Sequence, residues 1–171
     1  MSRKTLWLTR CSLLCAVALG ASLLEMLLPV LPFLPPGAKP GLANIALMAA
    51  AYTLGPGAAF AVAVVKALFA LMMRGAAAFL MSMAGGLLST AVMLLMMRSG
   101  LFGPAGIGVG GAVSHNLAQL GTAALLLTPG VQYYLPWMLV FAVVSGLLTG
   151  MVCGWLRPVL SRYQTVLPMT P

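Results

Sequence analysis

The polar residues best suited to chemistry lie together in one apolar stretch, His115-Asn116-Leu117-Ala118-Gln119. His115 and Gln119 are four residues apart, so in a helix they share one face, with Asn116 beside them. An imidazole and two amides inside an apolar helix are costly unless they meet partners or a ligand. The cluster therefore indicates either a ligand-binding site or a clamp that joins neighbouring helices by hydrogen bonds.

Catalysis by this cluster is not expected, because the chain has one acidic residue, Glu25, and no Asp. No carboxylate or cysteine lies near His115 in sequence to activate a nucleophile, and a magnesium site needs carboxylate oxygens. Cys11 and Cys15 are one helical turn apart, but like Cys153 they lie in apolar sequence. We interpret these cysteines as small packing residues and expect no catalytic residue, no metal site and no cofactor.

Basic residues form a second candidate feature. Lys66 lies inside an apolar stretch, and Arg74 follows two helical turns later on a nearby face. Together with Lys39 they could line a site for a carboxylate or phosphate group. For Lys39 and Arg74 the alternative is snorkelling, in which a long basic side chain extends to the membrane interface. Glu25 is the one carboxylate that could pair with Lys66.

The amino-acid composition indicates the environment in which these candidate residues lie. Of the 171 residues, 62% are hydrophobic and only 6% are charged, and the formal net charge is +8. The basic residues separate apolar runs instead of clustering with aromatic residues, so no nucleic-acid partner is expected. Membrane lipid with anionic headgroups is a sufficient partner for this charge.

The sequence predicts an all-α, polytopic integral membrane protein with six transmembrane helices in a single domain, residues 1–171. A span needs about 20 apolar residues, and Pro and Gly clusters separate the apolar runs. The expected spans are about 6–28, 41–54, 58–73, 76–97, 107–127 and 135–156.

Six spans place both termini on one side of the membrane. Six basic residues then fall on that side: Arg3, Lys4, Arg10, Arg98, Arg157 and Arg162. Lys39 and Arg74 fall on the other side. The positive-inside rule therefore predicts that both termini lie in the cytoplasm.

Small residues at a spacing of four predict close helix packing. The pairs are Ser82 with Gly86, Gly85 with Ser89, and Ala16 with Gly20. The first-span pair, Ala16 and Gly20, could receive a helix of a partner protein. A glycine-rich run at residues 106–111 resembles a dinucleotide fingerprint only in its glycines, and we interpret it as a packing segment too.

Three motifs occur in a fixed order: Lys39-Pro-Gly-Leu-Ala-Asn44-Ile45, residues 82–89, and Gly111-Ala-Val-Ser-His115-Asn116-Leu-Ala-Gln119. In this arrangement the chain resembles a bacterial membrane family known as heptaprenyl diphosphate synthase component I, also called Gx transporters. The resemblance extends over about Leu6 to Leu156. The size and six-helix layout are in turn similar to the substrate-binding subunits, or S components, of energy-coupling-factor transporters.

The resemblance implies an S-component-like bundle with an external pocket, for which the Pro-rich connection before Lys39 would be a gate. The candidate ligand-binding residues are Lys39, Asn44, Lys66, Arg74, His115, Asn116 and Gln119. His115 would lie near the middle of the membrane, on the floor of such a pocket. Cytoplasmic ATPase subunits would act in trans, because the chain has no phosphate-binding loop.

The leading functional hypothesis is a non-enzymatic substrate-binding component of a transporter for a small anionic, isoprenoid-like or vitamin-like molecule. A non-catalytic accessory protein of isoprenoid or quinone metabolism, or of membrane redox work, is the alternative. A scaffold in which His115 and its neighbours only clamp helices is a third possibility. The enzymatic family name does not fit a catalytic subunit, since prenyl synthases hold Mg²⁺ through Asp-rich motifs.

Overall fold

The computed structural model describes residues 2–27, 41–126 and 129–166. These residues form six α-helices and one short 3₁₀-helix, and no strand. The elements are α1 (Arg3–Leu27), α2 (Ala43–Thr53), α3 (Pro56–Arg74), α4 (Ala76–Ser99), α5 (Pro104–Leu126), η1 (Pro129–Tyr134) and α6 (Leu135–Val166). The prediction of an all-α helical bundle is confirmed.

Two glycines make the connections around α3 very short. Gly55 precedes Pro56 at the start of α3, and Gly75 alone joins α3 to α4. Their φ angles, 86° and 84°, lie in a region that side chains with a Cβ rarely adopt. The single-residue turn at Gly75 places Arg74 at the tip of the α3–α4 hairpin.

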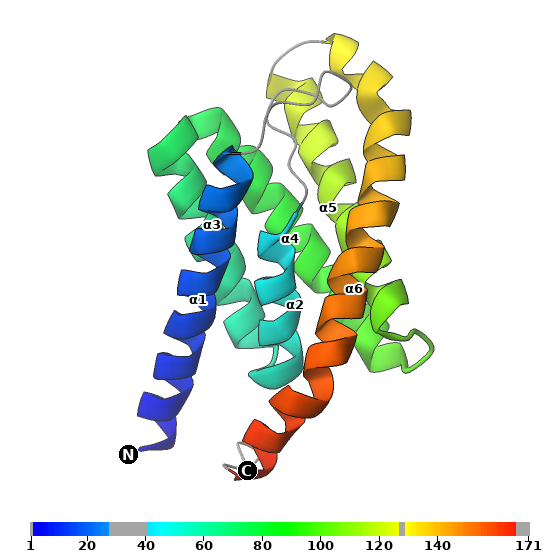
Figure 1. Cartoon of the computed structure of the whole chain (residues 1–171). Coiled ribbons are helices and arrows are strands. Elements are labelled where there is room, and N and C mark those ends of the chain that lie inside the picture. The colour runs from blue at the N-terminus through cyan, green and yellow to red at the C-terminus, as the bar shows by residue number, and fades with distance from the viewer. Residues whose placement is uncertain (1, 28–40, 127–128, 167–171) are drawn as a thin grey trace.

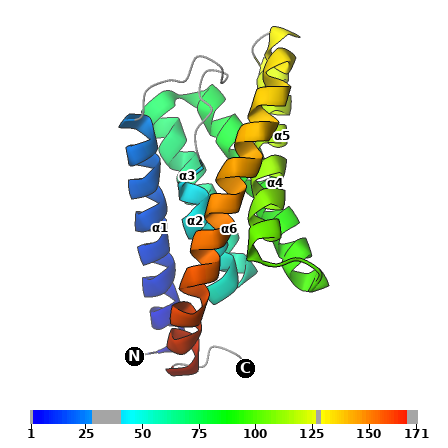
Figure 2. The same cartoon turned by 45° about the vertical axis from the view of Figure 1, so that its right-hand side comes forward.

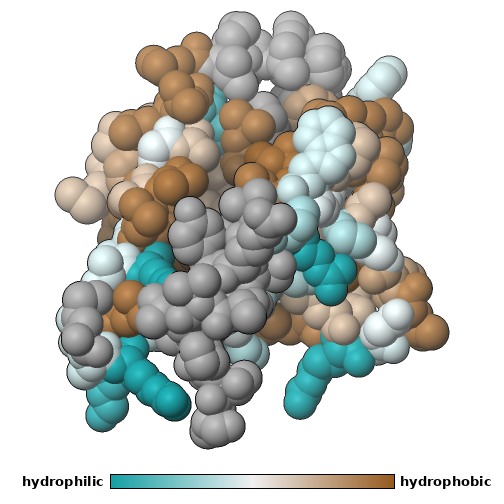
Figure 3. All heavy atoms as spheres, turned by 60° about the horizontal axis from the view of Figure 1, so that its bottom comes forward, coloured by the Kyte–Doolittle hydropathy of each residue, from teal (hydrophilic) through white to brown (hydrophobic). Residues whose placement is uncertain are grey.

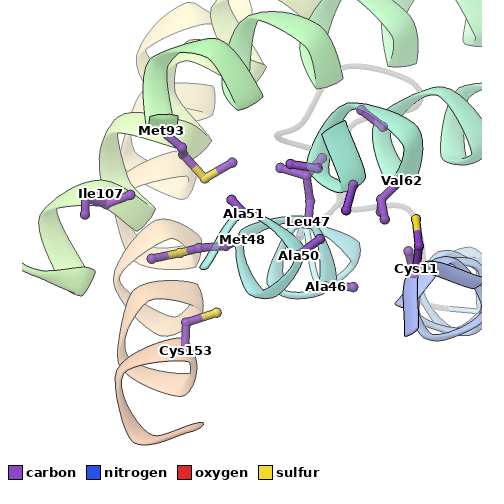
Figure 4. Close-up of a cluster of buried hydrophobic side chains, with 14 residues drawn as sticks. Cys11, Ala46, Leu47, Met48, Ala50, Ala51, Val62, Met93, Ile107 and Cys153 are labelled. Carbon is purple, nitrogen blue, oxygen red and sulfur yellow. The ribbon is translucent and has the colours of Figure 1, made fainter. Parts of the chain in front are cut away.

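Helix α2 occupies the centre of the bundle (Figure 1), where it packs against α1, α3, α4 and α6. It is buried on nearly every side and rich in alanine, which lets its neighbours approach closely. Figure 4 shows Leu47 and Met48 of α2 among buried side chains from the surrounding helices, including Val62 and Met93. This cluster is the main apolar core.

Four of the described helices are long and apolar enough to cross a membrane: α1, α3, α4 and the Leu135–Pro158 part of α6. Helix α5 has 23 residues and is not among these four, because His115, Asn116 and Gln119 interrupt its apolar sequence. Helix α2 has only 11 residues, about 16 Å at 1.5 Å per residue. It therefore covers only about half of a hydrocarbon core, which is roughly 30 Å thick.

Helices α5 and α6 cross with their backbones in direct contact. The contact uses Gly108, from the run 106–111 that was interpreted as a packing segment, and Gly146 and Gly150 of α6, which the sequence patterns above did not include. A Cβ added at Gly146 of α6 would lie 2.6 Å from Cα of Val109, and one at Gly150 would lie 2.5 Å from Cα of Ala105. Gly108 of α5 meets the backbone of Gly146 and Gly150 in the same way. Any side chain at these positions would separate the two helices.

The first residues of α1 and the last residues of α6 lie at the same end of the bundle (Figures 1 and 2). Figure 3 looks onto this end and shows hydrophilic side chains projecting from it, among apolar ones. At this end Arg157 of α6 lies over the ring of Tyr52 of α2, 5.6 Å from its centre. The polar cluster of α5 lies further along the bundle.

Candidate ligand-binding site

A small cavity of about 40 Å³ lies between α1, α3, α4 and α5. Its lining includes the C-terminal parts of α1 and α3, and these parts lie in the half of the bundle away from the chain termini (Figure 1). Phe69 and Met73 of α3 form part of its apolar wall. Its lining residues come from the ends or middles of four helices and from the residues just before α2: Ser22, Glu25, Met26, Gly41, Lys66, Phe69, Ala70, Met73, Arg74, Ser82, His115 and Gln119.

Lys66 connects the cavity to the first turn of α2. Its Nζ donates a hydrogen bond of 2.8 Å to Oδ1 of Asn44, whose side chain is buried. The bond orients the ammonium group, since lysine is otherwise a flexible point charge. Asn44 therefore belongs to the site through Lys66, although it does not itself line the cavity.

Glu25 lies in the wall of the same cavity with 5% of its surface exposed. Its Oε1 accepts a hydrogen bond of 3.3 Å from the backbone N–H of Ala43, the first residue of α2. The Arg74 guanidinium interacts electrostatically with this carboxylate. The cavity thus combines two cationic side chains with one carboxylate.

His115 is 6% exposed and forms the inner part of the cavity wall. Its ring packs against Gly85 of α4. A Cβ added at Gly85 would lie 2.9 Å from Nδ1 of His115 and 3.0 Å from Cγ of Gln119, so the absence of a side chain at Gly85 leaves room for both residues. Nδ1 has no hydrogen-bond partner within the described part of the chain. A buried polar atom without a partner costs roughly 1–3 kcal/mol, and His115 also lines the cavity, where a ligand could contact its ring.

The structure brings together most of the candidates chosen from the sequence. Lys66, Arg74, His115 and Gln119 share the cavity. Asn116 instead faces α6, where its Nδ2 donates a hydrogen bond of 3.3 Å to the carbonyl oxygen of Met138. Lys39 and the Pro-rich connection lie outside the described residues.

The small-residue pairs of α4 pack inside the bundle. Gly85 meets α5 at His115, and a Cβ at Gly86 would lie 3.3 Å from Cβ of Ala63 on α3. Ser89 is buried beside Gly111 of α5, whereas Ser82 lines the cavity instead.

The pair on α1 behaves differently. Ala16 and Gly20 are exposed, and nothing lies within 4 Å of a Cβ built at Gly20. Nothing in the described part of the chain packs on this pair, so its proposed partner helix stays a prediction.

Several cavity residues were not chosen from the sequence, although helical periodicity could have found them. Ser22, Glu25 and Met26 are spaced i, i+3, i+4 on α1. On α3 the lining residues from Lys66 to Arg74 follow i, i+3, i+4, i+7, i+8. In each case one helix face carries the lining, and Lys66 or Glu25 alone would have indicated that face.

Replacing Asn116 by alanine should affect stability without affecting ligand binding. The hydrogen bond to α6 would be lost, at a cost of about 1 kcal/mol. Thermal unfolding of the detergent-solubilised protein would measure the loss. Gln119→Ala is the matched comparison, since Gln119 faces the cavity. If N116A removed a bound molecule as completely as Q119A did, Asn116 would have to be counted among the ligand-binding residues.

The bundle and its buried polar cavity define a class of helical, multi-pass membrane protein. In fold it is similar to the S component of a bacterial ECF transporter, with a TM-score of 0.54, 19% sequence identity, and coverage of 95% of this chain and 97% of that one. The model of the heptaprenyl diphosphate synthase component I family matches residues 14–156. The chain belongs to this family. No curated protein matches it.

Proposed function

We propose that this protein is a membrane-embedded, substrate-binding component of a transporter for a small anionic, isoprenoid-like or vitamin-like molecule. The observation that carries the proposal is the polar cavity inside an apolar bundle, lined by Lys66, Arg74 and His115, whose Nδ1 has no hydrogen-bond partner among the described residues. Charged and polar groups inside a membrane protein are costly and mark substrate pathways. The S-component fold supports the same reading.

The cavity size limits how the ligand enters. Ligand pockets commonly have volumes of roughly 300–1,000 Å³, whereas this cavity has about 40 Å³, room for a few water molecules. A vitamin-sized ligand therefore requires the elements around the cavity to move apart. A ligand with only a few heavy atoms would not.

Catalysis is not part of the proposal. The one carboxylate in the sequence already accepts a hydrogen bond from the start of α2. A prenyl synthase needs several carboxylate oxygens to hold Mg²⁺ on a diphosphate. The protein would therefore bind its ligand and leave it chemically unchanged.

Transport would need partner subunits. The exposed small-residue pair, Ala16 and Gly20, would accept a helix of a partner membrane protein, and ATPase subunits would bind that partner from the cytoplasm. The basic residues near the ends of α1, α4 and α6 support a cytoplasmic location for both termini. The cavity would then lie in the outer half of the bacterial inner membrane.

Native mass spectrometry of the protein, gently solubilised from its own host, tests the proposal. We expect a retained small molecule in the wild-type protein, and its loss in His115→Ala. Ser145→Ala is a suitable control, because Ser145 lies on α6 outside the cavity. ATPase subunits in the same complex would support the transport role. A chain that carries only bulk lipid would argue for an accessory or scaffold role instead.

A further inference from the structure

The groups around Glu25 in the cavity are of the kinds that bind an anion. Helix α2 begins inside the bundle, and the amide of its first residue, Ala43, points at the Glu25 carboxylate. The N-terminus of a helix carries a partial positive charge and unsatisfied N–H groups, so it favours anions. The Arg74 guanidinium adds a full positive charge nearby.

Lys66 adds a second positive charge to the same cavity. Its ammonium is fixed by Asn44, one residue beyond Ala43, so both groups are tied to the first turn of α2. Discontinuous helices that start inside a membrane protein commonly direct their N-termini at the anionic group of a substrate. Here the group at that position is the protein's own carboxylate.

A separate observation indicates that this cavity receives a ligand. His115 of α5 also lines it, and its Nδ1 has no hydrogen-bond partner among the residues described. Glu25 accepts a hydrogen bond from the amide of Ala43, whereas Nδ1 of His115 lacks a partner in the described part of the chain. The unsatisfied part of the cavity would be completed by a bound molecule.

Resting on the proposed function, we propose that the Glu25 carboxylate occupies the position of the ligand's acidic group. The ligand would carry a carboxylate or phosphate that replaces Glu25 at the Ala43 amide and beside Arg74. The rest of the ligand would extend toward His115 and Gln119. Because Glu25 is on α1 and Ala43 begins α2, binding would release the hydrogen bond that joins these two helices.

Chemical rescue of Glu25→Ala tests this inference. Deleting the carboxylate leaves the Ala43 amide and the cationic side chains without their anion, and opens space for a small one. We expect acetate or inorganic phosphate to raise the midpoint of thermal unfolding of E25A in detergent. The rise should be about 4 °C at ten times the dissociation constant. Sodium chloride at equal ionic strength should not do so.

Two further variants and the wild type complete the experiment. The wild-type protein and Ser22→Ala, which changes the same cavity wall but keeps Glu25, should respond to acetate and phosphate no more than to chloride. Glu25→Gln keeps the shape without the charge, and should gain a weaker anion response that remains measurable if E25A does not fold. A stronger response to acetate would indicate a carboxylate ligand, and a stronger response to phosphate a phosphorylated one.

An equal response of all these proteins to the three salts would overturn the inference. That outcome would leave the transporter proposal intact, because a ligand without an acidic group could still be retained in native mass spectrometry. Conversely, anion rescue of E25A without any retained molecule or partner would establish the anion site but not the transport role.

Discussion

Replacing Gly150 by alanine should destabilise the bundle strongly. The new Cβ would lie 2.5 Å from Cα of Ala105 and 2.9 Å from its backbone nitrogen, so α5 and α6 would have to separate. Overpacking a well-packed site costs about 1–3 kcal/mol, and backbone atoms cannot move aside as a side chain can. We expect the unfolding midpoint in detergent to fall by on the order of 5–10 °C.

Gly154→Ala is the matched control for this prediction. Gly154 lies one turn further along α6, and a Cβ there would be 3.5 Å from Cβ of Pro104, an ordinary contact. Alanine is also the better helix former by roughly 1 kcal/mol. G154A should therefore unfold at or above the wild-type temperature. Equal midpoints for G150A and G154A would show that the crossing tolerates a wider separation than the structure has.

Replacing Lys66 by methionine should weaken ligand binding strongly while the bundle stays folded. Methionine keeps most of the length of the side chain and removes the ammonium group that donates to Asn44. A hydrogen bond to a charged group contributes about 1.5–3 kcal/mol, which corresponds to roughly a 10- to 150-fold loss of affinity. Native mass spectrometry measures ligand retention, and thermal unfolding of the same preparation measures stability. Together they distinguish a loss of binding from a loss of folding.

Arg98→Met provides the comparison for Lys66→Met. Arg98 is an exposed residue in the last turn of α4, away from the cavity lining, so its removal changes the net charge equally. Ligand occupancy should remain at the wild-type level in R98M. If both variants lost the ligand to the same extent, overall charge rather than the cavity would govern binding.

The α5 cluster shows how far helical periodicity can predict a site. The spacing of four correctly put His115 and Gln119 on one face, and they share the cavity. Asn116 is adjacent in sequence, but one residue turns the helix by about 100°, and its amide reaches α6 instead. All three residues are polar and therefore costly to place in a membrane helix without a partner. Only the positions of α4 and α6 decide which of the three residues line the cavity.

Glu25 and the glycines of α6 show what the sequence alone left undetermined. A lone carboxylate is compatible with any of several basic partners, and its contact with a backbone amide depends on where α2 begins. Gly146, Gly150 and Gly154 recur every four residues, a pattern that favours close packing. The partner of that face, the start of α5, follows only from the three-dimensional arrangement. The helical class of the fold, by contrast, follows from hydrophobic runs alone.

The shortness of α2 also constrains how the protein is made. Insertion into a bilayer recognises segments of about 20 apolar residues, and the 11 residues of α2 fall well below this length. Its polar backbone ends would meet hydrocarbon unless neighbouring helices already surrounded them. Two of the helices that pack most extensively on α2, α3 and α6, follow it in the chain. We therefore expect the central helix to be fully enclosed only after α6, the last helix, has been made.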